Sequence, residues 1–434
     1  MPPPPARPLD RAVVAAGLGL VRLFYPEIAV TGAPPARGPV ILVANHPNGL
    51  LDPIVLRLGL GRPVAFLGKS TLFANPVGKR VMEAFGAIPV YRAKEADTSK
   101  NEETFDRCRA LLRDAGWLAL FPEGISHDLP ALQPLKTGAA RIALASGGAG
   151  VTVVPVGLLY EEKEVFRSRA ALAFGAPIEV PAGEAGPEAV RALTARIAEA
   201  LGAVVLQAED KALWQGFVAV ASWTDAEGGR DLAAVDRRAR EISAAYAALS
   251  VSDPDRVLAI VGATRRFVRV LAAIGVSDPL ALEARPISPI RALLPLLLLA
   301  PVALLGAVLA WLPYRLVKPL ALRMAGGHAD IVGTLKAMLG TFILGLTWLG
   351  EAALAGAWFG LAAGLGMLVV GPLSGLVALR WSERFALRRE ALHASWLATR
   401  RESIAAAVAE RRCALVAEVE SALASVPSTP ERGR

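Results

Sequence analysis

The chain has 434 residues, long enough for two or three domains. Hydrophobic residues make up 54% of it and charged residues 20%, so the apolar excess must be concentrated, and most of it lies after residue 290. The net charge of +8 favours anionic partners, either phosphate-bearing substrates or an anionic membrane surface. The sequence has no basic run interleaved with aromatic residues and no nucleic-acid motif, so we expect no nucleic acid as a partner.

The two cysteines, Cys108 and Cys413, lie far apart in different segments. This usage predicts neither a disulfide framework nor a zinc site, and it fits a reducing compartment. The first residues, M-P-P-P-P-A-R-P, lack the layout of a cleaved signal peptide. We expect no metal and no cofactor.

Residues 10–25 form an apolar pattern that predicts a helix carrying Arg11 and Arg22. Such a helix is too short to cross a bilayer comfortably. Two interpretations stay open: an interfacial helix within residues 1–30, and an ordinary packing helix.

Between residues 31 and 182, apolar strand patterns alternate with helical patterns. The predicted strands are Val40–Ala44, Val64–Leu67, Ala87–Tyr91, Trp117–Phe121, Val151–Leu159 and Ala171–Phe174. The predicted helices are Leu50–Leu60, Pro76–Phe85, Lys100–Ala115 and Gly138–Ser146. This alternation is typical of an α/β domain, here a mixed sheet flanked by helices.

The end of the first predicted strand carries the run N-H-P-N-G-L-L-D-P, with His46 at the strand end and Asp52 in the first helical turn. Asn and Gly tolerate positive φ, so the Pro-Asn-Gly bend allows the two side chains to meet. A carboxylate that accepts from one imidazole nitrogen leaves the other nitrogen to take a proton from a hydroxyl. No serine or cysteine stands beside His46, so that hydroxyl belongs to a substrate. For an isolated pair, a turn cap is the competing interpretation.

Other predicted strands are also followed by polar residues, and catalytic and binding residues are often found at such strand ends. Arg92 follows one strand and suits a phosphate; Glu123 follows another and suits a hydroxyl, with Gly124 allowing close approach. Lys136 opens a helix and supplies a positive charge beside free N–H groups. A surface arginine and a solvated turn are the alternatives. Pro155 predicts an edge or irregular strand.

Four blocks together resemble the glycerolipid acyltransferase superfamily: N-H-P-N-G-L-L-D-P, G-A-I-P-V-Y-R, F-P-E-G and V-P-V-G, in family order. The resemblance covers about residues 35–180. It implies that His46 is the general base and Asp52 its orienting partner. It also implies that Arg92, Glu123 and Gly124 bind the acceptor's glycerol phosphate.

The His and Asp are separated by five residues, whereas most of the family separates them by four. The longer form, with Asn45 and Asn48, resembles a branch of glycerol-3-phosphate and glycerone-phosphate acyltransferases, and we count both asparagines among the substrate-binding candidates. The resemblance implies acyl-CoA or acyl-carrier protein as donor and a glycerol-phosphate acceptor. A 1-acylglycerol-3-phosphate acceptor and a non-catalytic lipid-binding or transport protein are the alternatives.

Residues 183–290 predict a charged helical extension, and residues 291–382 a transmembrane region. The apolar stretch 292–313 predicts one span, and the block 331–380 predicts two, with Glu351 near the turn or inside the bilayer. Basic flanks on both sides leave two spans as an alternative. Residues 383–434 predict a polar helical tail. We expect a multi-pass membrane protein in contact with membrane lipids, with a cytoplasmic catalytic domain.

Overall fold

The computed structural model describes residues 7–91, 101–146, 150–180, 186–224 and 230–426. They form two compact units. The first unit comprises residues 1–215, 231–243 and 328–334, and the second comprises 216–230, 244–327 and 335–434. The predicted domain boundaries stay predictions, and the first unit differs from them by including both the helix after residue 186 and the short segment 328–334.

The first unit is built on a mixed sheet with the strand order β1-β7-β6-β2-β5-β3-β4, in which β8 pairs with β6. Its strands are β1 (Glu27–Thr31), β2 (Val40–Ala44), β3 (Ala65–Lys69), β4 (Ala87–Val90), β5 (Trp117–Leu120), β6 (Thr152–Tyr160), β7 (Arg169–Phe174) and β8 (Ile178–Glu179). Among these, β7 and β8 run antiparallel to β6, and the other pairs are parallel. The predicted fold class, a mixed sheet flanked by helices, is confirmed.

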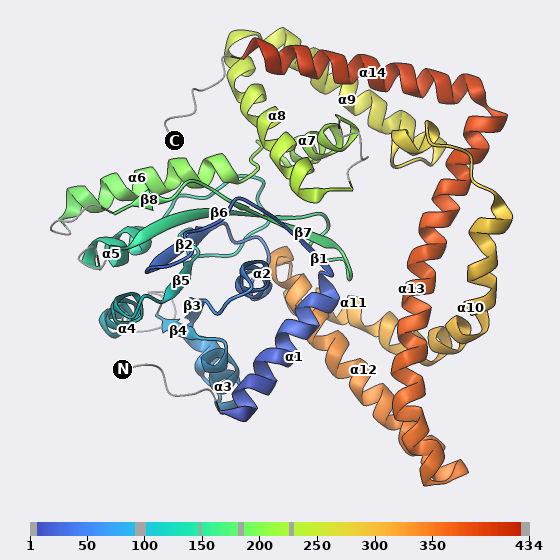
Figure 1. Ribbon diagram of the computed structural model, residues 1–434, viewed down its shortest axis with the longest axis horizontal. Helices are drawn as coiled ribbons and strands as arrows, with labels where there is room; N and C mark the ends of the chain where they lie inside the picture. Colours follow the sequence, from blue (N-terminus) through green and yellow to red (C-terminus); the bar gives the residue numbers. More distant parts are fainter. Residues whose placement is uncertain (1–6, 92–100, 147–149, 181–185, 225–229, 427–434) are drawn as a thin grey trace. The chain divides into compact units, whose positions relative to one another are not determined.

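The helices of this unit lie on both sides of the sheet (Figure 1). They are α1 (Pro8–Phe24), α2 (Leu51–Leu60), α3 (Pro76–Ala84), α4 (Asn101–Arg113), α5 (Gly138–Ala145) and α6 (Pro187–Val204). One core cluster joins α4, α5 and α6 to the strands, and it includes Leu112, Ile142 and Ile197. All five residues of β2 are buried, as expected for a central parallel strand with an uninterrupted apolar run.

The strand with Pro155 is central, so the prediction of an edge strand is wrong. β6 lies between β2 and β7, and Pro155 itself pairs with Val43 of β2. The proline is tolerated because it stands where the antiparallel partner of β6 changes from β8 to β7, opposite residues 175–177, which join these two strands. There its carbonyl accepts from the N–H of Gly175 at 2.9 Å. At this change of partner strand, the N–H that proline lacks is not needed for strand pairing.

Strand β1 was not predicted from the sequence. Residues 27–31 are short and only partly buried, and they pair with β7 at the edge of the sheet. A five-residue run that begins with Glu27 gives little periodic signal. Tertiary pairing with β7 therefore decides its conformation.

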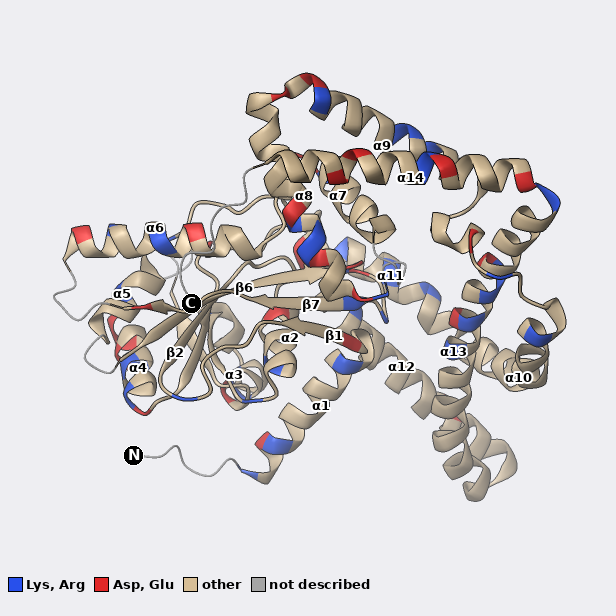
Figure 2. Ribbon diagram, turned by 45° about the horizontal axis from the view of Figure 1, so that its top comes forward, with Lys and Arg blue, Asp and Glu red and all other residues tan. Residues whose placement is uncertain are grey.

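The second unit is helical. The helices of this half of the chain are α7 (Lys211–Thr224), α8 (Leu232–Ser252), α9 (Pro254–Ile274), α10 (Pro289–Leu309), α11 (Trp311–Ala325), α12 (Ala329–Phe359), α13 (Leu361–Arg400) and α14 (Glu402–Ser425). Basic residues recur along α9 and α13 (Figure 2). Within the unit, α10 and α13 approach so closely that a Cβ on Gly306 would lie 1.9 Å from the carbonyl oxygen of Ser374. Glycine is required at that crossing because no side chain fits.

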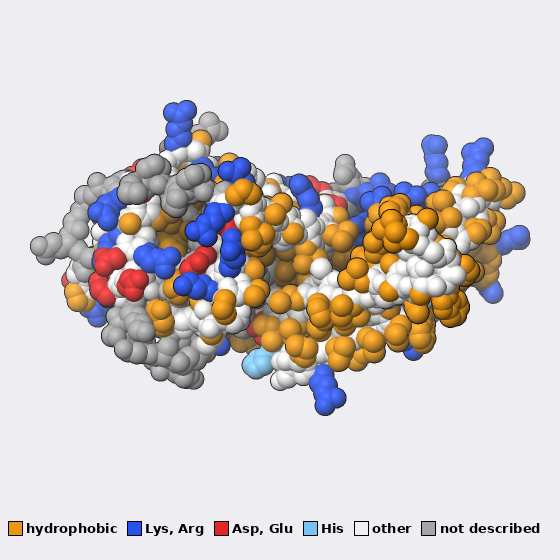
Figure 3. Space-filling model, turned by 90° about the horizontal axis from the view of Figure 1, so that it is seen from below, with side chains coloured by type: hydrophobic (Ala, Val, Ile, Leu, Met, Phe, Trp, Pro, Cys, Tyr) orange, Lys and Arg blue, Asp and Glu red, His pale blue; other side chains and the backbone are white. Residues whose placement is uncertain are grey.

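Three helices of the described chain are long and apolar enough to cross a membrane: α10, α12 and α13. Hydrophobic side chains cover much of the visible face in this region (Figure 3). The break between α12 and α13 falls at Gly360, which has a φ of 90°. Glu351 therefore lies inside α12, and the prediction that it stands near the turn is wrong. Gly360 was the better turn signal because its positive φ suits glycine alone.

Gly157 supplies a stability test of the packing of α6 on β6. A Cβ at this position would lie 1.8 Å from the carbonyl oxygen of Val204. We expect Gly157→Ala to lower the free energy of unfolding by about 1–3 kcal/mol, since backbone must move. Gly202→Ala in α6 is the control, because its nearest neighbouring atom is 3.4 Å away. Chemical denaturation in detergent measures both, and equal stabilities would contradict the packing described.

Candidate active site

The bend after β2 brings together the two residues that the sequence pairs. His46 Nδ1 lies 2.8 Å from Asp52 Oδ2. Gly49 adopts a φ of 53°, and the backbone N–H groups of Leu51 and Asp52 donate to the carbonyls of Asn48 and Gly49, which closes the turn. The positive φ explains the glycine in this motif. A strand, a tight turn and the first turn of α2 thus build the dyad.

The carboxylate of Asp52 is fully buried and accepts hydrogen bonds at both oxygens. Oδ2 accepts from the backbone N–H of Asn48 at 2.8 Å in addition to its contact with His46. Oδ1 accepts from the hydroxyl of Tyr160 at 2.6 Å. Burial, reinforced by the nearby Asp52 carboxylate, raises the pKa of Tyr160 well above its usual value, so the hydroxyl stays a donor. This network fixes the orientation of the carboxylate toward His46.

His46 is the exposed member of the dyad, with 17% of its side chain accessible. Its ring stacks on Phe121 with centroids 4.1 Å apart and an interplanar angle of 16°. Since Nδ1 faces the carboxylate, the neutral tautomer carries its proton on Nδ1 and leaves the Nε2 lone pair available. Nε2 makes no hydrogen bond within the part of the chain that the structure describes. This arrangement suits a general base.

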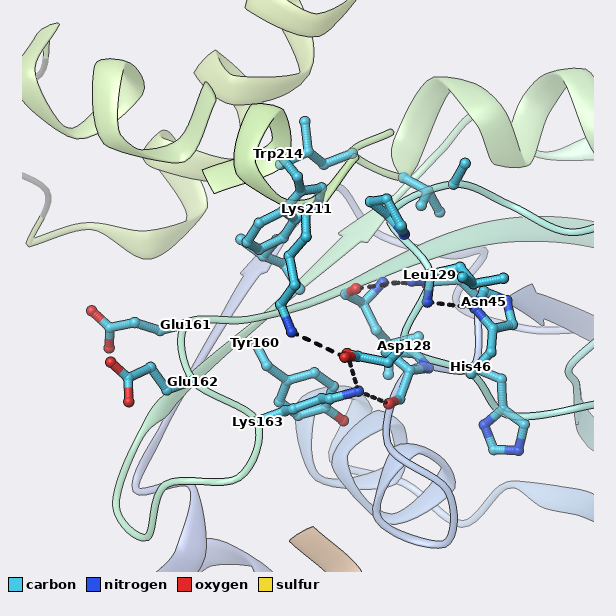
Figure 4. Close-up of a pocket in the computed structure, with 18 of the residues that line it drawn as sticks. Asn45, His46, Asp128, Leu129, Tyr160, Glu161, Glu162, Lys163, Lys211 and Trp214 are labelled. Atoms are coloured by element: carbon cyan, nitrogen blue, oxygen red, sulfur yellow. Dashed lines mark hydrogen bonds and ion pairs between the residues drawn. The ribbon is translucent and has the colours of Figure 1, made fainter. Parts of the chain in front are cut away.

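A cavity of about 450 Å³ opens beside His46 within the first unit (Figure 4). Apolar side chains line part of it, among them Leu132, Leu206 and Trp214. Asp128 lies between two lysines, with its oxygens 2.5 Å from Lys163 Nζ and 3.0 Å from Lys211 Nζ. Burial opposes ionisation of Asp128, but the two ammonium groups outweigh it and lower the pKa of this carboxyl. The cavity therefore combines an apolar wall with a charged mouth.

The two asparagines of the first block are engaged within the protein. The side-chain amide of Asn45 donates to the carbonyl of Leu158 at 3.0 Å and accepts from its N–H at 2.7 Å, which extends the pairing of β2 with β6. Asn48 is fully buried, and its Nδ2 donates to the hydroxyl of Tyr25 at 2.7 Å. Asn45 borders the cavity, whereas Asn48 supports the bend beneath it.

Glu123 and Gly124 lie in the loop after β5. The Glu123 side chain is fully buried; its Oε2 lies 2.5 Å from His127 Nε2 and accepts from the N–H of Gln133 at 2.7 Å. The N–H of His127 in turn donates to the carbonyl of His46 at 3.1 Å. Gly124 has a φ of 71°. This loop is thus tied directly to the residue that the sequence identifies as the base.

Lys136 and Arg92 are the predicted cationic groups. The Lys136 side chain is exposed and lies over Gly124, where a Cβ would meet Nζ at 2.5 Å. Lys136 N–H donates to the carbonyl of Pro122 at 2.7 Å, so the residue is anchored beside the same loop. Arg92 lies outside the described residues.

Sequence reasoning missed several groups that the structure brings to the site. His127, one of four histidines in the chain, stands four residues after Glu123, and that spacing was a usable signal. Tyr160 and Lys163 had no such signal, because they follow a strand far along the chain and reach the dyad only through the sheet. Within the described ranges, no cluster of His, Cys, Asp and Glu could hold a metal ion.

The comparisons with known proteins identify the class of the α/β domain. Residues 27–159 match the family model described as Acyltransferase. The chain is 45% identical over 91 residues to glycerol-3-phosphate O-acyltransferase 2 of Saccharomyces cerevisiae, covering 20% of this chain and 12% of the relative. It is 32% identical over 126 residues to the chloroplastic 1-acyl-sn-glycerol-3-phosphate acyltransferase BAT2 of Brassica napus, covering 29% and 34%. The chain spans less than half the length of the curated relatives it matches.

Among solved structures, the chain matches a crystal structure of the 1-acyl-sn-glycerophosphate acyltransferase PlsC from Thermotoga maritima. The TM-score is 0.33 and the identity 21%, over 44% of this chain and 77% of that chain. The mixed sheet, the dyad and the family match define an acyltransferase domain. Residues 27–159 of the chain are thus similar to the Acyltransferase family, and the relatives named above are glycerolipid acyltransferases.

Tyr160→Phe tests the hydrogen bonding of the buried carboxylate. The substitution leaves Oδ1 of Asp52 without its donor, and we expect the free energy of unfolding to fall by about 1–3 kcal/mol. Tyr246→Phe is the control, because Tyr246 packs on Phe217 and its hydroxyl makes no hydrogen bond within the described residues. Denaturant titration compares the two. A Tyr160→Phe protein as stable as the control would show that the hydroxyl contributes nothing.

Proposed function

We propose that this protein transfers a fatty acyl group from an acyl thioester to the hydroxyl of glycerol 3-phosphate or glycerone phosphate, an early step of phospholipid synthesis. The observation that carries the proposal is the His46–Asp52 contact of 2.8 Å, with the second imidazole nitrogen directed away from the carboxylate. The name of the yeast relative supports a glycerol-3-phosphate acceptor.

In the proposed mechanism His46 Nε2 removes the proton of the acceptor hydroxyl as its oxygen attacks the thioester carbonyl carbon. Asp52 holds the Nδ1–H tautomer and stabilises the imidazolium that forms. The tetrahedral intermediate collapses, the carbon–sulfur bond breaks, and the departing thiolate accepts the proton from Nε2. The products are an ester and a free thiol, and His46 returns to its starting state.

Acceptor binding in this proposal draws on cationic side chains. Lys136 is exposed and lies beside Gly124, so its ammonium is available for a phosphate. Arg92 keeps the phosphate-binding role that the family resemblance implies. Because the Glu123 carboxylate is buried and held by His127, we assign it an indirect role, through the loop that carries Gly124.

The donor occupies the cavity beside His46 in this proposal. Its apolar wall suits the thioester arm of acyl-CoA or acyl-carrier protein, and Lys211 at 65% exposure suits an anionic end. We also propose a multi-pass membrane protein with a cytoplasmic catalytic domain. Support comes from α10, α12 and α13, each long and apolar enough to span a bilayer.

A second acceptor, 1-acylglycerol 3-phosphate, is favoured by the name of the plant relative. The chemistry at the dyad would be identical, because both acceptors present a hydroxyl near a phosphate. Acceptor choice then depends on whether the site accommodates one acyl chain or two.

Purified protein assayed with acyl-CoA and each acceptor side by side tests the function. We expect ester formation with glycerol 3-phosphate, and a fall of about 10²–10⁴-fold in kcat for His46→Ala, since the general base is lost. His393→Ala is the control, because His393 contacts the carbonyl of Ile274 in the other unit. Full activity in His46→Ala would refute the mechanism, and ester formation with 1-acylglycerol 3-phosphate alone would select the second acceptor.

Direct transfer predicts that no acyl-enzyme accumulates. The described residues that contact the dyad include no serine or cysteine, and burial raises the pKa of the Cys108 thiol to about 12. Intact-protein mass spectrometry after incubation with donor alone should show no added acyl mass. A stoichiometric adduct that disappears on addition of acceptor would instead establish a covalent intermediate.

A further inference from the structure

A short segment far along the chain belongs to the acyltransferase unit. Residues 328–334 cluster with the α/β domain, although α12, which begins at Ala329, continues to Phe359 and is one of the three helices apolar enough to span a membrane. Asp330 and Val332 are buried, at 8% and 3% exposure. The first turn of this candidate membrane helix is therefore buried against other parts of the protein. Two loops of the proposed site make these contacts.

The first contact is with the loop after β5. The hydroxyl of Ser126 donates to Oδ2 of Asp330. Ser126 lies between Gly124 and His127, and the N–H of His127 donates to the carbonyl of His46. Ser126, which contacts the first turn of α12, is therefore the sequence neighbour of His127, whose N–H donates to the backbone of the proposed base.

The second contact is with the bend between His46 and Asp52. A Cβ on Gly333 would lie 2.7 Å from Oδ1 of Asn48 and 2.9 Å from the carbonyl oxygen of Lys163. A Cβ on Gly49 would lie 3.2 Å from the carbonyl oxygen of Asp330. A side chain at position 333 would collide with Asn48 and Lys163, and one at position 49 would be crowded against the carbonyl of Asp330.

Asn48 connects this contact to the dyad. Its backbone N–H donates to Oδ2 of Asp52, the oxygen that also contacts His46. Its side chain is held between Tyr25 and the helix turn. A displacement of Asn48 by α12 would therefore move the donor that orients the carboxylate.

We propose that residues 328–334 are a positioning segment of the acyltransferase site, and that the apolar helix α12 is thereby required for catalysis as well as for anchoring. The segment holds the bend after β2 and the loop after β5 at the same time, through Gly333 and Asp330. This inference rests on the proposed function. It implies that the α/β domain, taken without the C-terminal helices, lacks part of its own site.

Gly333→Ala in the full chain tests the proposal, with Gly340→Ala as the matched control in the same helix. A Cβ on Gly340 meets no atom within 4 Å, so both substitutions change helix propensity alike and only one meets Asn48. We expect Gly333→Ala to lower kcat at least tenfold with the acceptor KM changed less than threefold, while Gly340→Ala keeps wild-type kcat. Wild-type kcat in Gly333→Ala would overturn the proposal.

Amide hydrogen exchange of the peptide containing residues 45–52 provides a readout that does not depend on activity. We expect faster exchange of this peptide in Gly333→Ala than in Gly340→Ala, because the Asn48 N–H loses its fixed acceptor. Equal exchange in both variants would count against the proposal. If the wild-type protein transfers no acyl group but the exchange difference is present, the proposed function fails and the coupling between α12 and the bend stands.

Asp330 variants decide the matter if Gly333→Ala does not fold. Asp330→Asn retains an oxygen that accepts from Ser126, whereas Asp330→Ala removes it. We expect Asp330→Ala to lower kcat at least fivefold and Asp330→Asn to keep more than half of it, at unchanged unfolding midpoints. Equal and full activity of the two variants would overturn the proposal.

Discussion

The site depends on one buried carboxylate. Asp52 has no exposed surface, and its oxygens are satisfied by donors from the bend at Asn48, from His46 and from Tyr160 at the end of β6. A buried ionised group without such partners is strongly destabilising. Because this carboxylate must receive hydrogen bonds, the end of β2, the bend and the end of β6 have to lie next to one another. The orientation of the His46 ring follows from it.

The sheet explains why these groups converge. β2 lies between β5 and β6 and runs parallel to both, so the carboxyl ends of all three strands meet at one edge. His46 follows β2, the loop with Glu123 follows β5, and Tyr160 ends β6. Ligands of open α/β sheets bind at this edge. The dyad, the loop that carries Gly124 and the cavity are neighbours for this reason.

Many of the polar side chains near the dyad hold it in place. Asn45 extends a strand pairing, Asn48 supports the bend, and Glu123 anchors His127, which is bonded through its backbone to His46. A general base needs a fixed tautomer and an open second nitrogen, and these contacts supply the first while leaving the second free. Direct acyl transfer suits a site whose general base is held in a fixed orientation. The turn of α12 extends the same support to a segment nearly three hundred residues away from the bend.

Local sequence determined the α/β alternation, the bounds of β2 and the meeting of His46 with Asp52. Each depends on signals within a few residues: an apolar run, a Pro-Asn-Gly bend and the start of a helix. Tertiary structure alone decided that β6 is central despite Pro155, that β1 exists, and that Glu123 points inward toward His127. It also decided that Tyr160, Lys163 and Asp330 lie at the site. The direction of a side chain after a turn, and the partner of a strand edge, are set by packing between segments far apart in sequence, which no local pattern encodes.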